Sequence, residues 1–359
     1  MAEQAKLTRR SVGTAGYWAA ALDPDRKRLY CGATDATVHV YDIARPGEPP
    51  VAALGGHSSY VTAVAFSRSA AMLLSAGYDR RLVGRRPDQG EPVWTVSLNA
   101  PAKCLTVSPD GTQAAAALDD LRIGIWEVAT GKPIRLLEGQ HAPRTEIGRP
   151  STVYAVAWSP DGALLASGDR TGQICLWEGV SGRFVARLDA GSLYSQALYR
   201  NKLGGSEYEW GGVRSLCFSP DGRLLFAGGM GPADQNSAGL DGLMEILAFE
   251  VGARKGVARA PVEKGKGVLY ALTTLPGGRW VLGGGGGGGA GNGGSGLLCL
   301  WAHAARDSGG KPVSPVMFPS AMVGRDLVLA PDGKQAFLVG MEKSVTAGRL
   351  EWWDLSPGA

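Results

Sequence analysis

The sequence predicts an all-β chain in which one strand-rich unit occurs seven times in 359 residues. A turn of sequence Pro-Asp-Gly recurs along the chain, at residues 109–111, 160–162, 220–222 and 331–333. Further along each of these units, an apolar run ends in an aromatic residue followed by an acidic one. One such unit cannot bury its own apolar face, so neighbouring units must pack on one another.

The clearest copy of the unit is residues 159–178, SPDGALLASGDRTGQICLWE. Proline fixes φ, aspartate hydrogen-bonds to its own backbone and glycine accepts a positive φ, so Pro160-Asp161-Gly162 predicts a tight turn. Residues 164–167 form an apolar run of strand length, 168–172 form a second turn, and 174–177 are β-branched and aromatic. This copy therefore predicts three short strands joined by two turns.

The other units keep parts of this pattern. In three of them the turn position is held by Pro24-Asp25-Arg26, Ser67-Arg68-Ser69 and Pro276-Gly277-Gly278. The pairs that close the third strand are Tyr41-Asp42, Trp126-Glu127, Trp177-Glu178, Phe249-Glu250, Trp301-Ala302 and Trp353-Asp354. The second unit has Arg85-Arg86 at this place instead.

Together these motifs resemble the WD-repeat β-propellers, and the resemblance covers nearly the whole chain. It implies an all-β, seven-bladed β-propeller, a single domain over residues 1–359, with four antiparallel strands in each blade and a central channel. The blades are expected at residues 17–54, 60–98, 102–137, 153–188, 213–260, 268–318 and 325–354. The chain ends just after the third strand of the last blade, so we expect residues 6–12 to supply its outer strand and close the ring. A frayed N-terminal tail is the alternative.

Four segments are longer than a compact blade needs, namely residues 139–151, 189–212, 229–242 and 283–296. In a propeller, the links between blades and the links from second to third strand emerge on one face, opposite the Pro-Asp-Gly turns. We therefore expect all four insertions on the same face of consecutive blades, where long loops on a rigid scaffold often carry function. The glycine-rich segment 283–296 is interpreted as a flexible loop, since no Gly-Lys-Ser/Thr follows it as in a phosphate-binding loop.

Residues 191–210 are the best candidate for partner contact because they combine tyrosines, a tryptophan and basic residues, which are enriched at interface hot spots. The predicted partner-binding residues are Tyr194, Tyr199, Arg200, Lys202, Tyr208, Trp210, Arg144 and Arg149. The alternative is a loop that covers the channel mouth and packs on its own barrel.

In many WD-repeat proteins a His, a Ser or Thr, an Asp and the Trp form a structural hydrogen-bond network within a blade. By this resemblance, the structural residues are His57, Ser75 and Asp79 in the second blade, Asp120 and Trp126 in the third, and His141, Ser167 and Trp177 in the fourth. Arg85 replaces the Trp of the second blade and Thr171 stands at the Asp position of the fourth, so no blade is expected to hold the full set. We interpret these histidines as structural rather than catalytic.

The second blade also contains a local basic cluster, Arg80, Arg81, Arg85 and Arg86. Strand alternation would place Arg81 and Arg85 on one face and the other two on the opposite face. A solvated blade surface explains such a cluster, and an acidic or phosphate-bearing partner is the alternative. The cluster lacks the interleaved aromatic residues that single-stranded nucleic-acid sites use.

Composition excludes several classes of function. A formal net charge of +4 points neither to nucleic acid nor to an anionic membrane. No apolar run is long enough to span a bilayer, and the N-terminus lacks the apolar core of a signal peptide. The five cysteines lie apart in predicted strands and are expected to be reduced, which favours a cytoplasmic location.

Motifs of known enzymes such as HExxH, CxxC and GxSxG are absent from the sequence, so no catalytic, cofactor-binding or metal-binding residue is predicted. The sequence therefore favours a non-catalytic scaffold, monomeric by itself, that binds a protein or peptide on the insertion face. A propeller enzyme, a hydrolase or lyase with its site at the channel mouth, is the alternative. Nucleic-acid binding through the arginines of the second blade is a third hypothesis.

Overall fold

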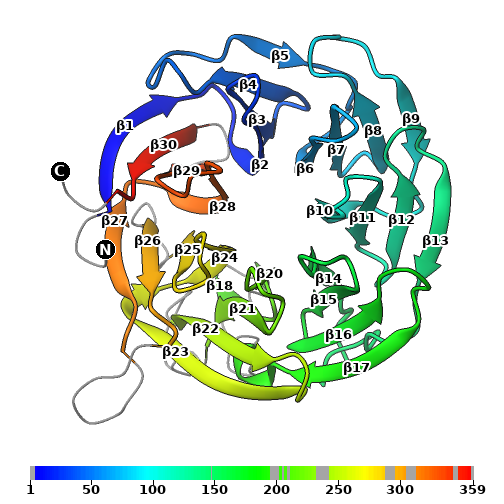
Figure 1. The fold of residues 1–359 in the computed structure, drawn as a ribbon, viewed down its shortest axis with the longest axis vertical. Coiled ribbons are helices and arrows are strands. Elements are labelled where there is room, and N and C mark those ends of the chain that lie inside the picture. The colour runs from blue at the N-terminus through cyan, green and yellow to red at the C-terminus, as the bar shows by residue number, and fades with distance from the viewer. Residues whose placement is uncertain are drawn as a thin grey trace. The chain divides into compact units, whose positions relative to one another are not determined.

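The computed structural model confirms the seven-bladed β-propeller, since it contains seven four-stranded antiparallel sheets (Figure 1). It describes residues 5–146, 148–194, 202–203, 206–207, 211–231, 242–287, 296–304, 313–342 and 347–356. The chain divides into two compact units, residues 6–139 with 325–359 and residues 140–324 with 1–5. We call the first the terminal unit and the second the middle unit, and describe each by itself.

The terminal unit holds blades one, two, three and seven. Their strands, in hydrogen-bonded order, are β2 (Tyr17–Asp23), β3 (Arg28–Ala33), β4 (Val38–Asp42) and β5 (Ala52–Leu54); β6 (Val61–Ser67), β7 (Met72–Gly77), β8 (Arg81–Arg85) and β9 (Trp94–Ser97); β10 (Ala102–Val107), β11 (Gln113–Leu118), β12 (Ile123–Glu127) and β13 (Pro133–Leu137); β28 (Val323–Leu329), β29 (Gln335–Met341), β30 (Gly348–Asp354) and β1 (Lys6–Val12).

The middle unit holds blades four, five and six. Their strands are β14 (Val153–Trp158), β15 (Leu164–Asp169), β16 (Gln173–Glu178) and β17 (Phe184–Asp189); β20 (Ser215–Phe218), β21 (Leu224–Met230), β22 (Leu243–Glu250) and β23 (Lys255–Lys266); β24 (Val268–Thr274), β25 (Val281–Gly286), β26 (Gly296–Trp301) and β27 (Val316–Ser320). Blade four is followed by a 3-10 turn, η1 (Gly191–Leu193), and a short pair, β18 (Lys202–Leu203) and β19 (Ser206–Glu207).

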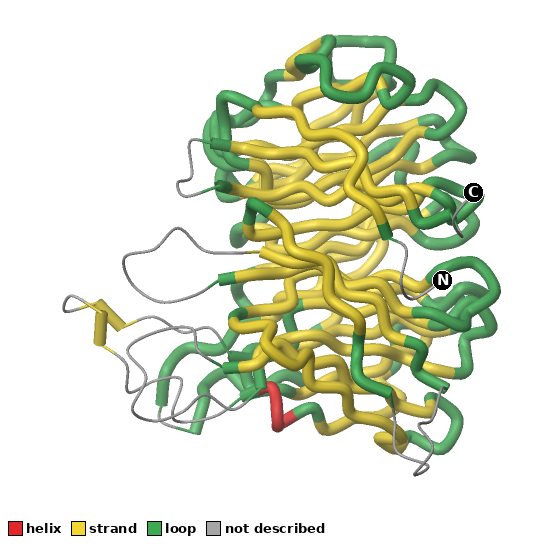
Figure 2. The backbone as a smooth tube through the Cα atoms, turned by 90° about the vertical axis from the view of Figure 1, so that its left-hand side faces the viewer, coloured by secondary structure: helices red, strands yellow, loops and turns green. Residues whose placement is uncertain are grey.

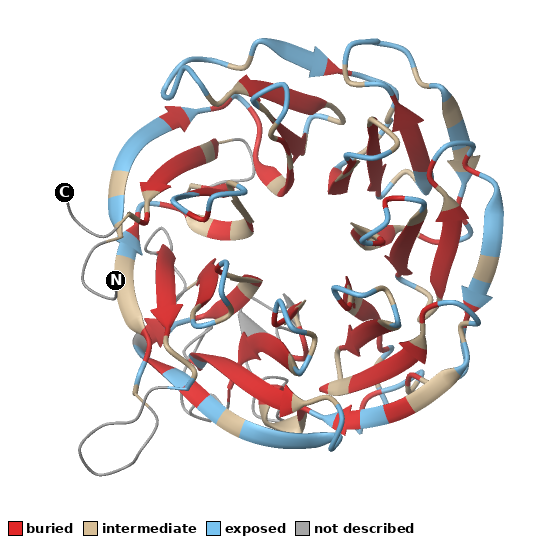
Figure 3. Cartoon of the chain, in the orientation of Figure 1, coloured by how far each residue is buried: buried red, intermediate tan, exposed pale blue. Residues whose placement is uncertain are grey.

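Sheet faces of neighbouring blades form the apolar core within each unit. Blades two and three share a cluster that includes Leu74, Leu105 and Trp126, and blades four and five share one that includes Leu176 and Phe218. Because both faces of the inner strands are covered, a strand such as β7 is buried along its whole length and carries a continuous apolar run. Figure 3 shows this burial, with exposed residues concentrated on outer strands such as β5 and β13.

The Pro-Asp-Gly turns form as predicted because side chains satisfy the backbone at each of them. At the blade-four turn, the Ser159 hydroxyl lies 2.6 Å from Asp161 Oδ1, which also accepts a hydrogen bond from the N–H of Ala163 at 3.0 Å. These bonds, chiefly the one from Ser159, lower the pKa of the Asp161 carboxyl. Gly162 has φ +71°, which glycine adopts without a steric cost.

Residues 283–286 correct the expectation of a flexible loop over 283–296. They are the last four residues of β25 and pair with both β24 and β26. A Cβ at Gly285 would lie 2.3 Å from the carbonyl oxygen of Val268, so the strands approach too closely there for any side chain. The glycine run is therefore partly a packing requirement of blade six, while residues 288–295 lie outside the described residues.

The N-terminal strand closes blade seven, as predicted. β1 pairs antiparallel with β30, from Lys6 opposite Asp354 to Val12 opposite Arg349. Arg10 Nε donates to Glu351 Oε1 at 3.0 Å, and the Trp353 indole N–H donates to the other carboxylate oxygen at 3.2 Å. The Glu351 side chain is 0% exposed, so β1 supplies the charge that this buried carboxylate requires.

We predict that Arg10→Ala lowers the free energy of unfolding by about 1–2 kcal/mol, because it removes the guanidinium from a buried carboxylate while water still reaches the 40% exposed Arg10 position. Urea denaturation followed by tryptophan fluorescence measures the loss. Arg45→Ala removes a matched pair whose arginine is 62% exposed and should change the free energy by less than about 0.5 kcal/mol. Equal effects of the two substitutions would contradict the proposed role of β1.

Candidate functional site

The four insertions lie in the middle unit apart from residue 139, and the described ends of the 189–212 insertion are hydrogen-bonded to each other and to blades four and five. The N–H of Gly212 donates to the carbonyl of Leu193 at 2.8 Å, and the N–H of Val213 donates to that of Asp169 at 2.9 Å. Ser192 Oγ lies 3.4 Å from Glu245 Oε2, which connects η1 to blade five. Figure 2 shows η1 at this end of the strands. We call this end of the middle unit the insertion face.

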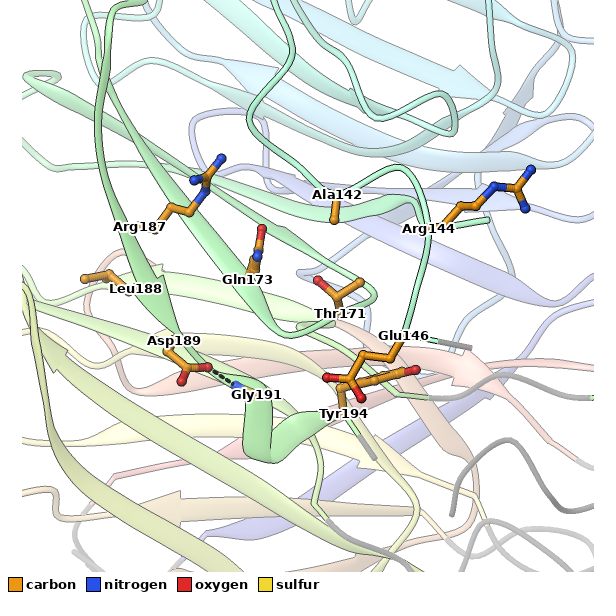
Figure 4. A pocket seen from close by; sticks show the side chains of 10 residues that line it. All are labelled: Ala142, Arg144, Glu146, Thr171, Gln173, Arg187, Leu188, Asp189, Gly191 and Tyr194. Carbon is orange, nitrogen blue, oxygen red and sulfur yellow. Dashed lines mark hydrogen bonds between the residues drawn. The ribbon is translucent and has the colours of Figure 1, made fainter. Parts of the chain in front are cut away.

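A pocket of about 620 Å³ opens on the insertion face at blade four (Figure 4). Its walls are the 142–146 segment, the turn between β15 and β16, the end of β17, and η1 with the residue that follows it. The lining residues are Ala142, Arg144, Glu146, Thr171, Gln173, Arg187, Leu188, Asp189, Gly191 and Tyr194.

Most residues that line the pocket have polar side chains, and several of these side chains are fixed by backbone groups. Arg187 Nη2 donates to the carbonyl of Gln140 at 2.7 Å, and Arg144 Nη1 donates to that of Gly148 at 2.6 Å. Asp189 Oδ1 accepts from the N–H of Gly191 at 2.7 Å, which holds the start of η1 against β17. This arrangement offers charged and neutral hydrogen-bonding groups in a frame whose geometry is set before any ligand binds.

The predicted partner-binding residues divide between this pocket and undescribed parts of the chain. Tyr194 and Arg144 line the pocket, and the backbone of Arg149 pairs with Thr145, whose hydroxyl accepts its N–H at 3.1 Å. Lys202 is described only as part of the backbone of β18. Tyr199, Arg200, Tyr208 and Trp210 lie outside the described residues.

Sequence reasoning missed Gln173, Arg187 and Asp189 as pocket residues. They lie at the ends of β16 and β17 that share the insertion face. Their position in the repeat could have identified them, because the expected strand order places the start of β16 and the end of β17 beside the 139–151 and 191–210 segments.

Blade four holds a complete four-residue network, which corrects the expectation that no blade would. His141 Nδ1 lies 2.7 Å from Asp169 Oδ2, and His141 Nε2 lies 2.8 Å from Ser167 Oγ. The Trp177 indole N–H donates to the same Ser167 oxygen at 2.8 Å. The aspartate is Asp169, the last residue of β15, whereas Thr171 donates its hydroxyl to Asp169 Oδ1 at 2.7 Å. Asp169 was missed because it comes two residues earlier than the position inspected.

The same atoms would suggest an activated nucleophile if they faced solvent, because a Ser–His–Asp chain is the arrangement of serine hydrolases. Ser167 and Asp169 are both 0% exposed, and the serine oxygen is already occupied by the Trp177 indole. A substrate therefore has no route to this hydroxyl, and the network stabilises the blade.

Blade two repeats most of this network with an arginine in place of the tryptophan. His57 Nδ1 lies 2.9 Å from Asp79 Oδ2, and His57 Nε2 lies 2.9 Å from Ser75 Oγ. Arg85 pairs with Leu73 across the strands just as Trp177 pairs with Leu165 in blade four.

The expectation of a solvated cluster of four arginines is wrong for Arg85. Its side chain is buried and donates to the carbonyls of Gly55, at 2.6 Å, and Gly90, at 3.2 Å. Arg80, Arg81 and Arg86 are exposed, as predicted. Simple alternation failed because both faces of β8 are covered beyond its first residue.

The two remaining structural candidates lie in blade three. Asp120 forms an ion pair with Arg122, and Trp126 is buried, with its ring against Gly124. In blade one the histidine comes from a strand instead: His39 Nε2 of β4 lies 2.8 Å from Asp35 Oδ2. All four histidines of the chain make hydrogen bonds within blades, the fourth being His303 to the carbonyl of Gly278 at 2.8 Å.

The described part of the chain contains neither a metal-binding group nor a reactive thiol. Its residues contain no group of three His, Cys, Asp or Glu side chains arranged to hold a metal ion. All five cysteines are free, and burial raises the pKa of Cys175 and Cys299 to about 12, so these thiols stay protonated. No helix in the described residues is long and apolar enough to cross a membrane.

Comparisons with known proteins agree with the fold. The family model described as "WD domain, G-beta repeat" matches residues 48–83, 142–178 and 202–235. The human angio-associated migratory cell protein is 30% identical over 173 residues, which are 48% of this chain and 37% of that protein. WD repeat-containing protein VIP3 of Arabidopsis thaliana is 30% identical over 227 residues, which are 60% of this chain and 63% of that protein.

The serine-threonine kinase receptor-associated protein of Dictyostelium discoideum is 25% identical over 196 residues, which are 44% of this chain and 64% of that protein. The chain thus spans between 37% and 64% of the length of these three relatives. The matches confirm the resemblance that the turn and strand motifs predicted.

We predict that Asp169→Asn lowers the free energy of unfolding by about 2–4 kcal/mol, because it removes a fully buried charge that His141 and the 171–173 backbone bind. Thr171→Ala removes one hydrogen bond to the same carboxylate and should cost at most about 1.5 kcal/mol. Chemical denaturation of both variants measures the difference. A larger loss of stability for Thr171→Ala than for Asp169→Asn would mean that residue 171, and not Asp169, is the fourth member of the network.

The burial of His57 predicts a pH dependence of stability. Burial lowers the pKa of His57 and outweighs the opposing effect of the Asp79 carboxylate. Between this lowered pKa and the ordinary value of about 6.5, the unfolded chain binds more protons than the folded chain, so the free energy of unfolding falls as the pH falls through this window. His57→Gln should remove this part of the slope in unfolding experiments at about pH 7.5 and about pH 5.5. If the free energy of unfolding changed equally with pH in the wild type and the variant, His57 would not be the source of the pH dependence.

Proposed function

We propose that this chain, which belongs to the WD-repeat β-propellers, is a non-catalytic scaffold that binds a protein or peptide partner on the insertion face. The observation that carries the proposal is the polar pocket at blade four, where two of the predicted contact residues, Tyr194 and Arg144, meet Gln173, Arg187 and Asp189.

Rigidity of the pocket supports binding rather than passive packing. Asp169 accepts the N–H groups of Thr171, at 2.8 Å, and Gln173, at 3.0 Å, so the wall between β15 and β16 is attached to the buried network of blade four. Leu193 is 0% exposed and fixes η1 on the core shared by blades four and five. A pre-formed site reduces the entropy lost when a partner binds.

The absence of catalysis in this proposal rests on where the reactive side chains lie. The one Ser–His–Asp chain with a complete set of partners is buried, and the histidines of blades one, two and six bind groups within their own sheets. The Dictyostelium relative is named as a receptor-associated protein, which describes association with another protein and fits the same class of role for this chain.

We further propose that the protein works as a monomer in the cytoplasm and that Tyr199, Arg200, Lys202, Tyr208, Trp210 and Arg149 extend the contact surface beyond the pocket. Free cysteines fit a reducing compartment. We do not propose nucleic-acid binding, because Arg85 of the basic cluster in blade two is buried and donates to the carbonyl of Gly55.

The test replaces residues 195–210 by a Gly-Ser linker and keeps 191–194, because Leu193 belongs to the core. We expect this variant and Tyr194→Ala to lose most partner capture in pull-downs from source lysate, with melting temperatures lowered by no more than about 4 °C. Arg183→Ala, at the opposite end of blade four and 70% exposed, is the matched control. Equal capture of the same partners by all variants would move the binding site away from the insertion face.

A further inference from the structure

The first strand begins with a β-bulge in blades one, two, three, four and six. The register shifts between Tyr17 and Ala19 in blade one and between Val153 and Ala155 in blade four, and it shifts at equivalent places in blades two, three and six. The extra residues are Trp18, Thr62, Lys103, Tyr154 and Tyr270. A bulge re-aims the side chain it carries and often occurs beside functional sites.

In the middle unit, the bulge residue Tyr154 contacts two guanidinium groups. Arg214 Cζ is 3.5 Å from the centroid of its ring, and Arg170 Cζ is 5.5 Å from it. Arg170 Nε also donates to the tyrosine hydroxyl at 2.9 Å, and its Nη1 donates to the carbonyl of Pro150. The three side chains therefore form a connected cluster on the insertion face, at the entry to blades four and five.

This cluster has the chemistry of an oxyanion receptor. A guanidinium stacked on an aromatic face keeps its N–H groups in its own plane, where they match the two oxygens of a carboxylate or phosphate. The tyrosine ring orients the cation and lowers the entropy lost on binding. Arginine is far better suited to such two-point contacts than lysine.

The segments around the Arg170–Tyr154–Arg214 cluster carry further positive charge. The 140–151 segment contributes Arg144 and Arg149, and the pocket adds Arg187. The carboxylates in the described part of this region include Glu146, Asp189 and Glu245; Asp189 is engaged by the N–H of Gly191, and Glu245 is buried and paired with Arg259. Asp169 is buried with His141.

The terminal unit also pairs a cationic side chain with an aromatic ring at its bulge positions, which argues that the pairing in the middle unit is more than local packing. Arg325 Cζ lies 4.7 Å from the ring of Trp18, the bulge residue of blade one. Lys103, the bulge residue of blade three, places Nζ 4.6 Å from the ring of Tyr78. Cation and aromatic side chains thus recur at bulge positions in separate blades.

We propose that Arg170, Tyr154 and Arg214 bind a carboxylate or phosphate group carried by an acidic segment of the peptide partner. This inference rests on the proposed function and specifies the chemistry of the partner at the same face. The pocket at blade four then receives neighbouring polar side chains of that segment.

The test uses three fluorescent peptides of equal length, one rich in glutamate, one with phosphoserine and one with glutamine at the same positions, and measures their binding to the full chain by anisotropy. We expect the two acidic peptides to bind, with affinity that falls as salt rises. Arg214→Gln and Arg170→Gln should each weaken this binding by about tenfold or more, whereas Arg183→Gln should not change it. Arg214→Lys should recover only part of the affinity, because it keeps the charge and loses the two-point contact.

Stronger binding of the phosphoserine peptide assigns the site to phosphate, and stronger binding of the glutamate peptide assigns it to carboxylate. Equal binding of the glutamine peptide, unchanged affinity of Arg214→Gln, or no binding of either acidic peptide would overturn the inference. Partner capture that depends on residues 195–210 would still support the scaffold in each of those cases, so the two proposals fail separately. Thermal melts of Arg214→Gln and Arg170→Gln beside the wild type check that any loss of binding in these variants is not a loss of fold.

Discussion

Packing of one sheet face on the next is the constraint on which the rest of this structure depends. A single four-stranded blade leaves two apolar faces exposed, so each blade is stable only with neighbours on both sides. This requirement makes the inner strands continuously apolar, selects alanine along β11, and selects glycine at the closest approach in β25. The buried carboxylates of Asp169 and Glu351 are satisfied by other side chains.

The blade-four network shows how little a set of residue types says about chemistry without its surroundings. Ser167, His141 and Asp169 have the hydrogen bonds of a catalytic triad, and only their burial makes them structural. Tyr154 with its two arginines is the opposite case: no catalytic motif marks it, yet it lies on the face that also carries the pocket and the insertions. Position relative to solvent therefore separates the two roles.

Local features of the fold were predictable from sequence because turns and strand composition are local. The Pro-Asp-Gly turns and the blade order follow from them, and the pairing of β1 with β30 follows from the four-strand repeat, which leaves the last blade one strand short. Arg85 and Gly285 were misread because their environments are made by residues elsewhere in the sequence, which no local pattern reports. Asp169 was missed because it comes two residues before the position where the repeat pattern places the aspartate. Pocket residues on β16 and β17 were missed for the same reason, since the pocket exists only when the 142–146 segment and η1 fold against them.

The pairing of β1 with β30 also has a consequence for how the protein is made. Thr8 donates its hydroxyl to the carbonyl of Trp352, across 344 positions of sequence. A ribosome releases β1 before β30, so β1 has an unpaired edge while the blades between the two strands are made. The three charged residues of β1, Lys6, Arg9 and Arg10, discourage that edge from pairing with other nascent chains until β30 emerges.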